Sequence, residues 1–355
     1  MAFELGILHF GELTPDPFTG QPPTAGVRLR ELIEQAKVAD QAGLDIFAVG
    51  EHHRGDFAVS APSVVLAAMA ENTRDIKLSS AVTVLSSDDP VRVFQQFATL
   101  DLISGGRAEI IAGRGSYIES FPLFGYDLND YSELYADKLG LLLALREENP
   151  VTWKGATRPP LHEADVNPQP GREIPVWVAV GGTPASVVRA AQLGLPMALA
   201  IIGGSYRQFA PFVDLYRRAA AEFGHDASAL KLSVSSPGFL APTHREAIDI
   251  SHPYFESGWM ANHHQRGQGV PMPVGAYEAQ STRAGAFFLG SPQEVIDKIL
   301  AQWELFHHDR MMIQMGFGDV PQKEMVRSIE LLGTEVAPVV RKEIASRQGS
   351  EGESK

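Results

Sequence analysis

The sequence predicts a single α/β domain folded as a (β/α)8 TIM barrel. Strand-like apolar runs alternate with helix-like segments along the 355 residues, and such alternation implies a parallel sheet covered by helices. Eight units in a chain of this length favour a closed barrel. An open doubly wound sheet is the alternative, but the dinucleotide-binding glycine fingerprint is missing after the first strand. We therefore expect one barrel domain over residues 1–345.

The first four units begin with short apolar runs, and the segments between them repeat apolar residues at helical spacing. The predicted strands cover 3–9, 46–49, 77–85 and 108–112, and the predicted helices cover 27–42, 62–72, 90–103 and 131–146. The first helix shows the spacing, with one face formed by Leu29, Ile33, Ala36 and Ala39. Polar residues before three later helices are predicted N-caps, namely Ser60, Asp89 and Asp130.

The last four units follow the same pattern, interrupted by two insertions. The predicted strands cover 174–180, 196–201, 231–236 and 310–315, and the predicted helices cover 184–193, 205–223, 292–305 and 322–332. The insertion after strand four, 148–173, is rich in Pro and Gly and predicts a hairpin. The insertion after strand seven, 241–290, is expected to be an irregular lid. The polar segment 346–355 predicts a disordered tail.

Composition excludes several classes of function. The net charge of −13 argues against a nucleic-acid partner, which requires a basic patch. The chain has no Cys, which excludes disulfides, thiolate metal sites and cysteine nucleophiles and fits a cytoplasmic protein. It shows no signal peptide and no apolar stretch of membrane-spanning length, so we expect no membrane association.

The run Glu51-His52-His53 follows the second strand, at the end of a barrel where catalysis occurs. Adjacent strand residues point to opposite sides, so only one imidazole is expected to face the barrel mouth, as an acid, a base or a hydrogen-bond donor. A histidine that merely ties strand to helix is the structural alternative. A metal hydrolase built on His9, His52 and His53 is the other, although we expect no metal.

A glycine turn follows the fifth strand and opens a helix. Gly181 and Gly182 let the backbone approach a ligand, and Thr183 and Ser186 add hydroxyls to the free N–H groups of the helix start. Such a turn can bind an anion, or it can be an ordinary capped turn. Arg114, which lies between glycines after the fourth strand, can clamp a phosphate or form a rim salt bridge.

The chain resembles the bacterial luciferase-like family of flavin-dependent monooxygenases over about residues 3–341. No single motif carries the resemblance, but together their order and spacing are specific. These motifs are Glu51-His52-His53, Pro90-Val91-Arg92, the segment 100–107, Gly113-Arg114-Gly115 and the segment 190–196.

The resemblance implies a flavin at the barrel mouth, either reduced FMN or a deazaflavin. Its phosphate would contact Arg114, Gly182, Thr183 and Ser186. The flavin ring would lie over a non-proline cis peptide bond, which matches Ala81–Val82. His52 matches the catalytic histidine of luciferase, and Glu51 would orient it. The reactive cysteine of luciferase is Gly113 here, so the luminescent reaction is not implied.

We therefore expect a monooxygenase that uses reduced FMN and O₂ to oxidise a small organic substrate through a C4a-peroxyflavin. A separate flavin reductase would supply the reduced FMN. The lid 241–290, with Trp259, His263 and His264, would cover the substrate. A deazaflavin-dependent oxidoreductase and a non-catalytic flavin-binding barrel are the alternatives. A homodimer is expected through the second and third helices, with the apolar residues Ala61, Val64, Val65, Ala68 and Met69.

Overall fold

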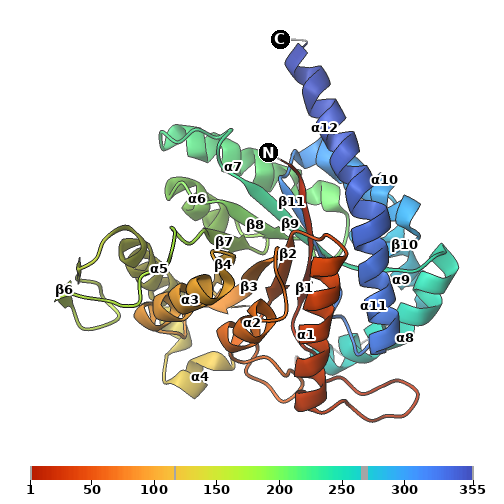
Figure 1. The fold of residues 1–355 in the computed structure, drawn as a ribbon, viewed down its shortest axis with the longest axis horizontal. Helices are drawn as coiled ribbons and strands as arrows, with labels where there is room; N and C mark the ends of the chain where they lie inside the picture. The colour runs from red at the N-terminus through yellow and green to blue at the C-terminus, as the bar shows by residue number, and fades with distance from the viewer. Residues whose placement is uncertain (1, 116, 265–270, 354–355) are drawn as a thin grey trace.

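The fold is a closed parallel β-barrel surrounded by helices (Figure 1). The structure, a computed structural model, describes residues 2–115, 117–264 and 271–353. The β1–β11 and β8–β9 pairings close the ring, which confirms the predicted barrel and excludes the open sheet. In order around the ring, the strands are β1 (Glu4–His9), β2 (Ile46–Val49), β3 (Lys77–Val84), β4 (Ala108–Gly113), β7 (Val176–Val180), β8 (Met197–Ala200), β9 (Leu232–Leu240) and β11 (Arg310–Gln314).

Helices follow the strands and cover the outside of the barrel. They are α1 (Ala25–Gln41), α2 (Pro62–Ala70), α3 (Pro90–Ser104), α4 (Ser120–Phe124), α5 (Tyr131–Glu147), α6 (Pro184–Gln192), α7 (Ala210–Glu222), α8 (His244–His264), α9 (Val274–Ser281), α10 (Pro292–Phe306), α11 (Gln322–Leu331) and α12 (Ala337–Glu353). In the described part of the chain, none of these helices is long and apolar enough to cross a bilayer.

The strands are rich in apolar residues because both of their faces are largely buried. All four residues of β2 are buried: Ile46 and Ala48 face the barrel interior, while Phe47 and Val49 pack in the core under the helices. The interior cluster is small and takes residues from several strands, namely Leu8, Ile46, Ala48, Ala81, Ile111, Trp177, Ala198 and Met312.

One of the predicted caps is confirmed, and another is wrong. The Asp89 carboxylate accepts hydrogen bonds from the N–H groups of Val91 and Arg92, as expected for an N-cap. Ser60 is not the cap of α2, because the helix starts one residue later and Ala61 holds that position. Asp130 precedes α5 but its side chain makes no capping bond among the described residues.

The first insertion is the predicted hairpin, in which β5 (Val151–Trp153) pairs antiparallel with β6 (Leu161–Ala164). The second is not irregular, because α8, α9 and β10 (Phe288–Gly290) occupy most of it. The helical spacing of its buried residues was present in the sequence but is interrupted by Pro253 inside α8. These buried residues are Ala247, Ile248, Ser251, Tyr254 and Phe255.

The segment 346–355, predicted to be a disordered tail, also differs from the expectation, because α12 continues as a helix to Glu353. Its first turns are anchored by Val340 and Ile344, which are both buried, and helix propagation from such an anchor needs little further stabilisation. Residues 354–355 of the predicted tail lie outside the described residues.

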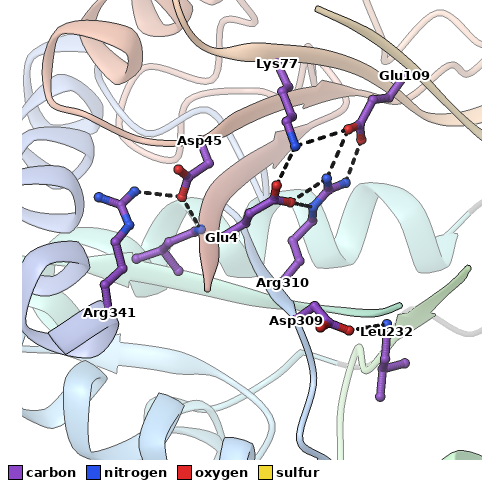
Figure 2. Close-up of polar contacts among 9 residues, drawn as sticks. Glu4, Asp45, Lys77, Glu109, Leu232, Asp309, Arg310 and Arg341 are labelled. Carbon is purple, nitrogen blue, oxygen red and sulfur yellow. Dashed lines mark hydrogen bonds and ion pairs between the residues drawn. The ribbon is translucent and has the colours of Figure 1, made fainter. Parts of the chain in front are cut away.

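A buried ion network joins strands at the N-terminal end of the barrel (Figure 2). Arg310, fully buried at the start of β11, donates to both carboxylate oxygens of Glu109 on β4 at 2.8 and 3.2 Å. It also donates to Glu4 on β1 at 2.7 Å, and its guanidinium lies 4.4 Å from the ring centre of Trp177. Lys77 on β3 bridges the same two carboxylates.

The charges in this network stabilise one another. Burial lowers the pKa of Arg310, but the charges of Glu109 and Glu4 outweigh burial and raise it above the ordinary value. Burial also raises the pKa of Glu4, yet Arg310 and Lys77 lower it overall. Arg310 and Glu4 are therefore both charged near neutral pH, and the network acts between four of the barrel strands.

A second group of contacts holds the outer layer at the same end (Figure 2). Asp45 accepts a 2.7 Å hydrogen bond from the Leu5 N–H, and it forms a 2.6 Å ion pair with Arg341 of α12. Asp309 accepts from the Leu232 N–H at 2.8 Å. These bonds fix the helix layer and the first residues of β1 and β9.

We predict that Arg310→Met lowers the free energy of unfolding by about 3–5 kcal/mol, because it leaves buried carboxylates without their main cation. Urea denaturation at pH 7 measures this loss. Arg347→Met is the control, since Arg347 forms a more exposed pair with Glu304, and it should change stability little. Equal, small losses in both variants would show that the buried network contributes little to stability.

Candidate functional site

A cavity of about 760 Å³ opens at the C-terminal end of the barrel. In Figure 1 the β1–α1 connection, α4 and α8 lie at this end. Residues from the ends of several strands and from α8 line it, which is the usual position of active sites in this fold.

Glu51, His52 and His53 all line the cavity. The prediction that only one histidine faces the mouth is therefore wrong. Strand alternation does not apply here, because β2 ends at Val49 and the three residues lie in the connection that follows.

His52 lies among aromatic rings. The centres of the rings of Phe10, Phe57 and Tyr117 are 5.0, 4.3 and 4.4 Å from the centre of its imidazole. Its Nδ1 lies 3.9 Å from Oε1 of Glu119, a carboxylate that also lines the cavity. The imidazole is therefore largely shielded from water and has an acid beside it.

Glu51 contacts the neighbouring strand and the other histidine. Its Oε1 accepts a 3.0 Å hydrogen bond from the Val84 N–H of β3 and lies 3.6 Å from Nε2 of His53. These contacts fix the connection after β2 against the end of β3. The expected role of Glu51 in orienting His52 stays a prediction.

The structure brings Arg114, Thr183 and Ser186 together, although they lie on different loops. Nη2 of Arg114 donates to Oγ of Ser186 at 3.2 Å and to Oγ1 of Thr183 at 3.4 Å. The two hydroxyls are 2.8 Å apart. Thr183 has the N-cap position of α6, but its hydroxyl makes no capping bond within the described residues. A guanidinium, two hydroxyls and a helix N-terminus thus meet at one corner of the cavity.

The turn before α6 leaves this corner open. A Cβ atom added to Gly181 would meet no atom within 4 Å, and Gly182 has a φ of +108°, which favours glycine. Tyr131 of α5 supports the other side of this corner. Tyr131 donates to the Gly115 carbonyl at 2.6 Å, and its ring centre lies 4.9 Å from the Arg114 guanidinium.

The peptide bond between Ala81 and Val82 is cis, as the sequence analysis predicts, and both residues line the cavity. The neighbouring Val82 side chain explains why residue 113 is glycine. A Cβ atom at Gly113 would lie 2.7 Å from the Val82 side chain, so neither a cysteine nor any larger residue fits.

No group of three or more His, Cys, Asp or Glu residues within the described ranges could hold a metal ion. His9 is buried beside Glu12, with 3.2 Å between Nδ1 and Oε2. The site therefore gives no support to the metal hydrolase alternative.

Only part of the predicted lid, 241–290, can be placed against the cavity. Trp259 on α8 lines the cavity, as expected. His263 and His264 belong to the end of α8, and their side chains lie outside the described part of the chain.

Sequence reasoning missed several cavity residues. Tyr117 and Glu119 lie between β4 and α5, and Glu12 and Thr14 belong to the connection after β1. An acid beside aromatic residues directly after a barrel strand is a signal that could have identified Glu12 and Glu119.

Comparisons with known proteins give the same fold and a family. The chain matches the luciferase-like monooxygenase family over residues 3–308. It is 27% identical over 351 residues to the 4-hydroxyprotoasukamycin monooxygenase of Streptomyces nodosus, covering 93% of this chain and 92% of that protein. It is 30% identical over 213 residues to the alkanal monooxygenase alpha chain of Photorhabdus laumondii, covering 59% of this chain and 58% of the relative.

Two solved structures share the fold. The oxygenating constituent of 3,6-diketocamphane monooxygenase from Pseudomonas putida, in complex with FMN, has a TM-score of 0.76 at 21% identity and covers 95% of this chain and 99% of that one. An F420-dependent secondary alcohol dehydrogenase with an F420-acetone adduct has a TM-score of 0.72 at 18% identity, covering 96% and 99%. The family match extends over most of the barrel, and we conclude that this chain belongs to the luciferase-like monooxygenase family.

Proposed function

We propose that the protein is a flavin-dependent monooxygenase that uses reduced FMN and O₂ to oxidise a small organic substrate. The observation that carries the proposal is the convergence of Arg114, Thr183 and Ser186 at one corner of a 760 Å³ cavity that also contains His52. Relatives named as monooxygenases and the FMN complex of a protein with the same fold support it.

The residues of the cavity fit a flavin. The corner at Arg114 offers a positive charge, two hydroxyls and the N-terminal end of α6, which together suit a phosphate. Ala81 and Val82 form an apolar floor for the flavin ring. The cavity volume lies in the range of small-molecule sites and leaves space beyond a phosphate group and ring.

When bound, the reduced flavin would supply the electrons that activate O₂. The chain positions the cofactor through Arg114 and excludes water through the aromatic residues around His52. The His52 imidazole holds or transfers a proton at the reacting centre, and Glu119 can balance the charge when Nδ1 is protonated.

A deazaflavin-dependent oxidoreductase is the second candidate, because a structure with this fold carries an F420 adduct. A flavin-binding barrel without activity is the third. The separate reductase and the cytoplasmic location stay predictions. Titration with reduced FMN and with reduced F420, followed by O₂ uptake with candidate substrates, separates the three. Substrate oxidation with F420 and without O₂ uptake would replace our proposal by the second candidate.

We predict that Arg114→Ala weakens FMN binding by about 1.5–3 kcal/mol, the contribution of hydrogen bonds to a charged group. Quenching of FMN fluorescence measures the affinity. The control is Arg189→Ala, which removes a cation from α6 that stacks on Tyr135 and is not among the described cavity residues. An unchanged affinity in Arg114→Ala would place the phosphate elsewhere.

We predict that His52→Ala lowers turnover about a hundredfold at saturating reduced flavin while FMN affinity changes little, because this histidine transfers a proton. His53→Ala should instead affect stability or cofactor affinity, since His53 contacts Glu51, which is bonded to β3. Substrate oxidation and FMN titration are measured for both variants. Full activity in His52→Ala would show that the imidazole has only a structural role.

We also propose a homodimer through α2 and α3. Val65 and Met69, part of the predicted contact, are buried within one chain, so the contact would use exposed residues instead. The apolar residues Val64, Leu102 and Ile103 are 68%, 51% and 46% exposed. This exposure is greater than expected for apolar residues that pack only within one chain. Light scattering should give a dimer mass at micromolar concentration, and Val64→Glu should shift it toward the monomer. A monomeric wild-type protein would exclude the dimer.

A further inference from the structure

The order of strands divides the cavity into two opposite walls. Around the closed ring β7 lies opposite β1, and β4 lies opposite β11. The corner with Arg114, Thr183 and Ser186 follows β4 and β7. A flavin that places its phosphate there leaves the wall that follows β1 and β11 to another molecule.

Glu12 is the charged residue of this second wall. It lines the cavity, yet its side chain is almost fully enclosed, with 6% of the residue exposed. Its backbone is fixed, because Glu12 forms an antiparallel bridge with Phe57 and its carbonyl accepts a 3.1 Å hydrogen bond from Nε of the buried Arg28. The backbone of Glu12 is therefore held in place, and the residue is largely shielded from solvent.

One oxygen of the Glu12 carboxylate, Oε2, lacks a hydrogen-bond donor among the described residues. The Gly11 N–H donates to Nδ1 of His9 at 2.9 Å, so that in this tautomer Nδ1 has no proton for Oε2 of Glu12, 3.2 Å away. Within the described residues Oε2 of Glu12 has no hydrogen-bond partner. A Cβ atom on Gly316 would lie 2.5 Å from this oxygen, so a glycine at the end of β11 keeps the space beside it open.

A second unpaired polar atom lies in the same wall. Thr14 lines the cavity, is 4% exposed, and its Oγ1 makes no hydrogen bond to any described residue. Helix α8 closes over this wall, because Gly258 lies against Gly318 and Thr14. Buried polar atoms are almost always paired, so two unpaired atoms on residues that line one cavity point to a group that binds there.

We propose that Glu12 and Thr14 form the substrate head-group site, which takes a hydroxyl or amine on an apolar ring system. This assignment depends on the proposed function in one respect, which is that the flavin occupies the opposite wall of the cavity. A carboxylate accepts hydrogen bonds and cannot donate when ionised, so the head group must carry an O–H or N–H. The Thr14 hydroxyl can donate to or accept from the same group.

The rest of this wall suits an apolar body. Phe10, Trp259 and Phe317 line the cavity and surround the space with rings. An analogue that fills the same space but lacks the donor would leave Glu12 buried and unpaired, which disfavours its binding. The site is therefore expected to discriminate hydroxyl compounds from their methyl ethers.

The test compares 2-naphthol with 2-methoxynaphthalene, which have the same ring body but differ in the donated proton. Calorimetric titration is carried out on the full chain, both without flavin and with saturating oxidised FMN. We expect 2-naphthol to bind roughly tenfold tighter or more, as for a hydrogen bond to a charged acceptor. Glu12→Gln replaces the charged acceptor by a neutral amide carbonyl and should reduce this preference, and Thr14→Val should also reduce it.

Asp56→Asn is the matched control. Asp56 also lines the cavity, but both of its oxygens already accept from Arg54 at 3.0 and 2.6 Å. This variant should keep the preference for the hydroxyl compound. Thermal melting checks that each variant is folded, and the comparison of the two probes in the wild-type protein needs no variant.

Equal affinity of the two probes for the wild-type protein would overturn the inference and would show that a resident water satisfies Glu12. An unchanged preference in Glu12→Gln would also overturn it. If FMN fails to bind but the preference is seen without flavin, the proposed function fails and the head-group site stands. If FMN binds and the preference is absent, the head-group site fails and the proposed function stands.

Discussion

The fold depends on a buried guanidinium at the start of its last strand. Arg310 lies on β11, which closes the ring by pairing with β1, and it reaches across the interior to Glu109 on β4. Glu4 and Lys77 complete the network. A barrel closes only when its first and last strands meet, so an ionic contact that includes both holds the closure. Removing one partner would leave the other charges buried and uncompensated.

Closure determines what can meet at the opposite end. The loops after β4 and β7 bring Arg114 to Thr183 and Ser186, whereas the loops after β1 and β11 bring Glu12 beside Gly316. One wall offers a cation and donors, and the other offers an acceptor. This polarity would orient the two proposed ligands in one cavity, because each wall favours a group of the opposite kind.

The chemistry lies between the two walls. His52 is enclosed by aromatic rings and has Glu119 within 3.9 Å of Nδ1. Stability and function are thus separated along the barrel axis, with the ion network at one end and the cavity at the other. The arrangement lets the loops vary while the strands stay fixed, which is the general basis of functional diversity in this fold.

The sequence alone determined the barrel and most of one wall. Periodicity located the strands, because a strand buried on both faces must be apolar, and Arg114 and the turn at Gly182 were visible because glycine and arginine have specific conformational and charge properties. Only the tertiary structure decided that His53 lines the cavity, that Glu51 pairs with Val84 and that one oxygen of Glu12 lacks a hydrogen-bond donor among the described residues. These depend on loop conformations and on contacts between residues distant in the chain, which no local pattern encodes.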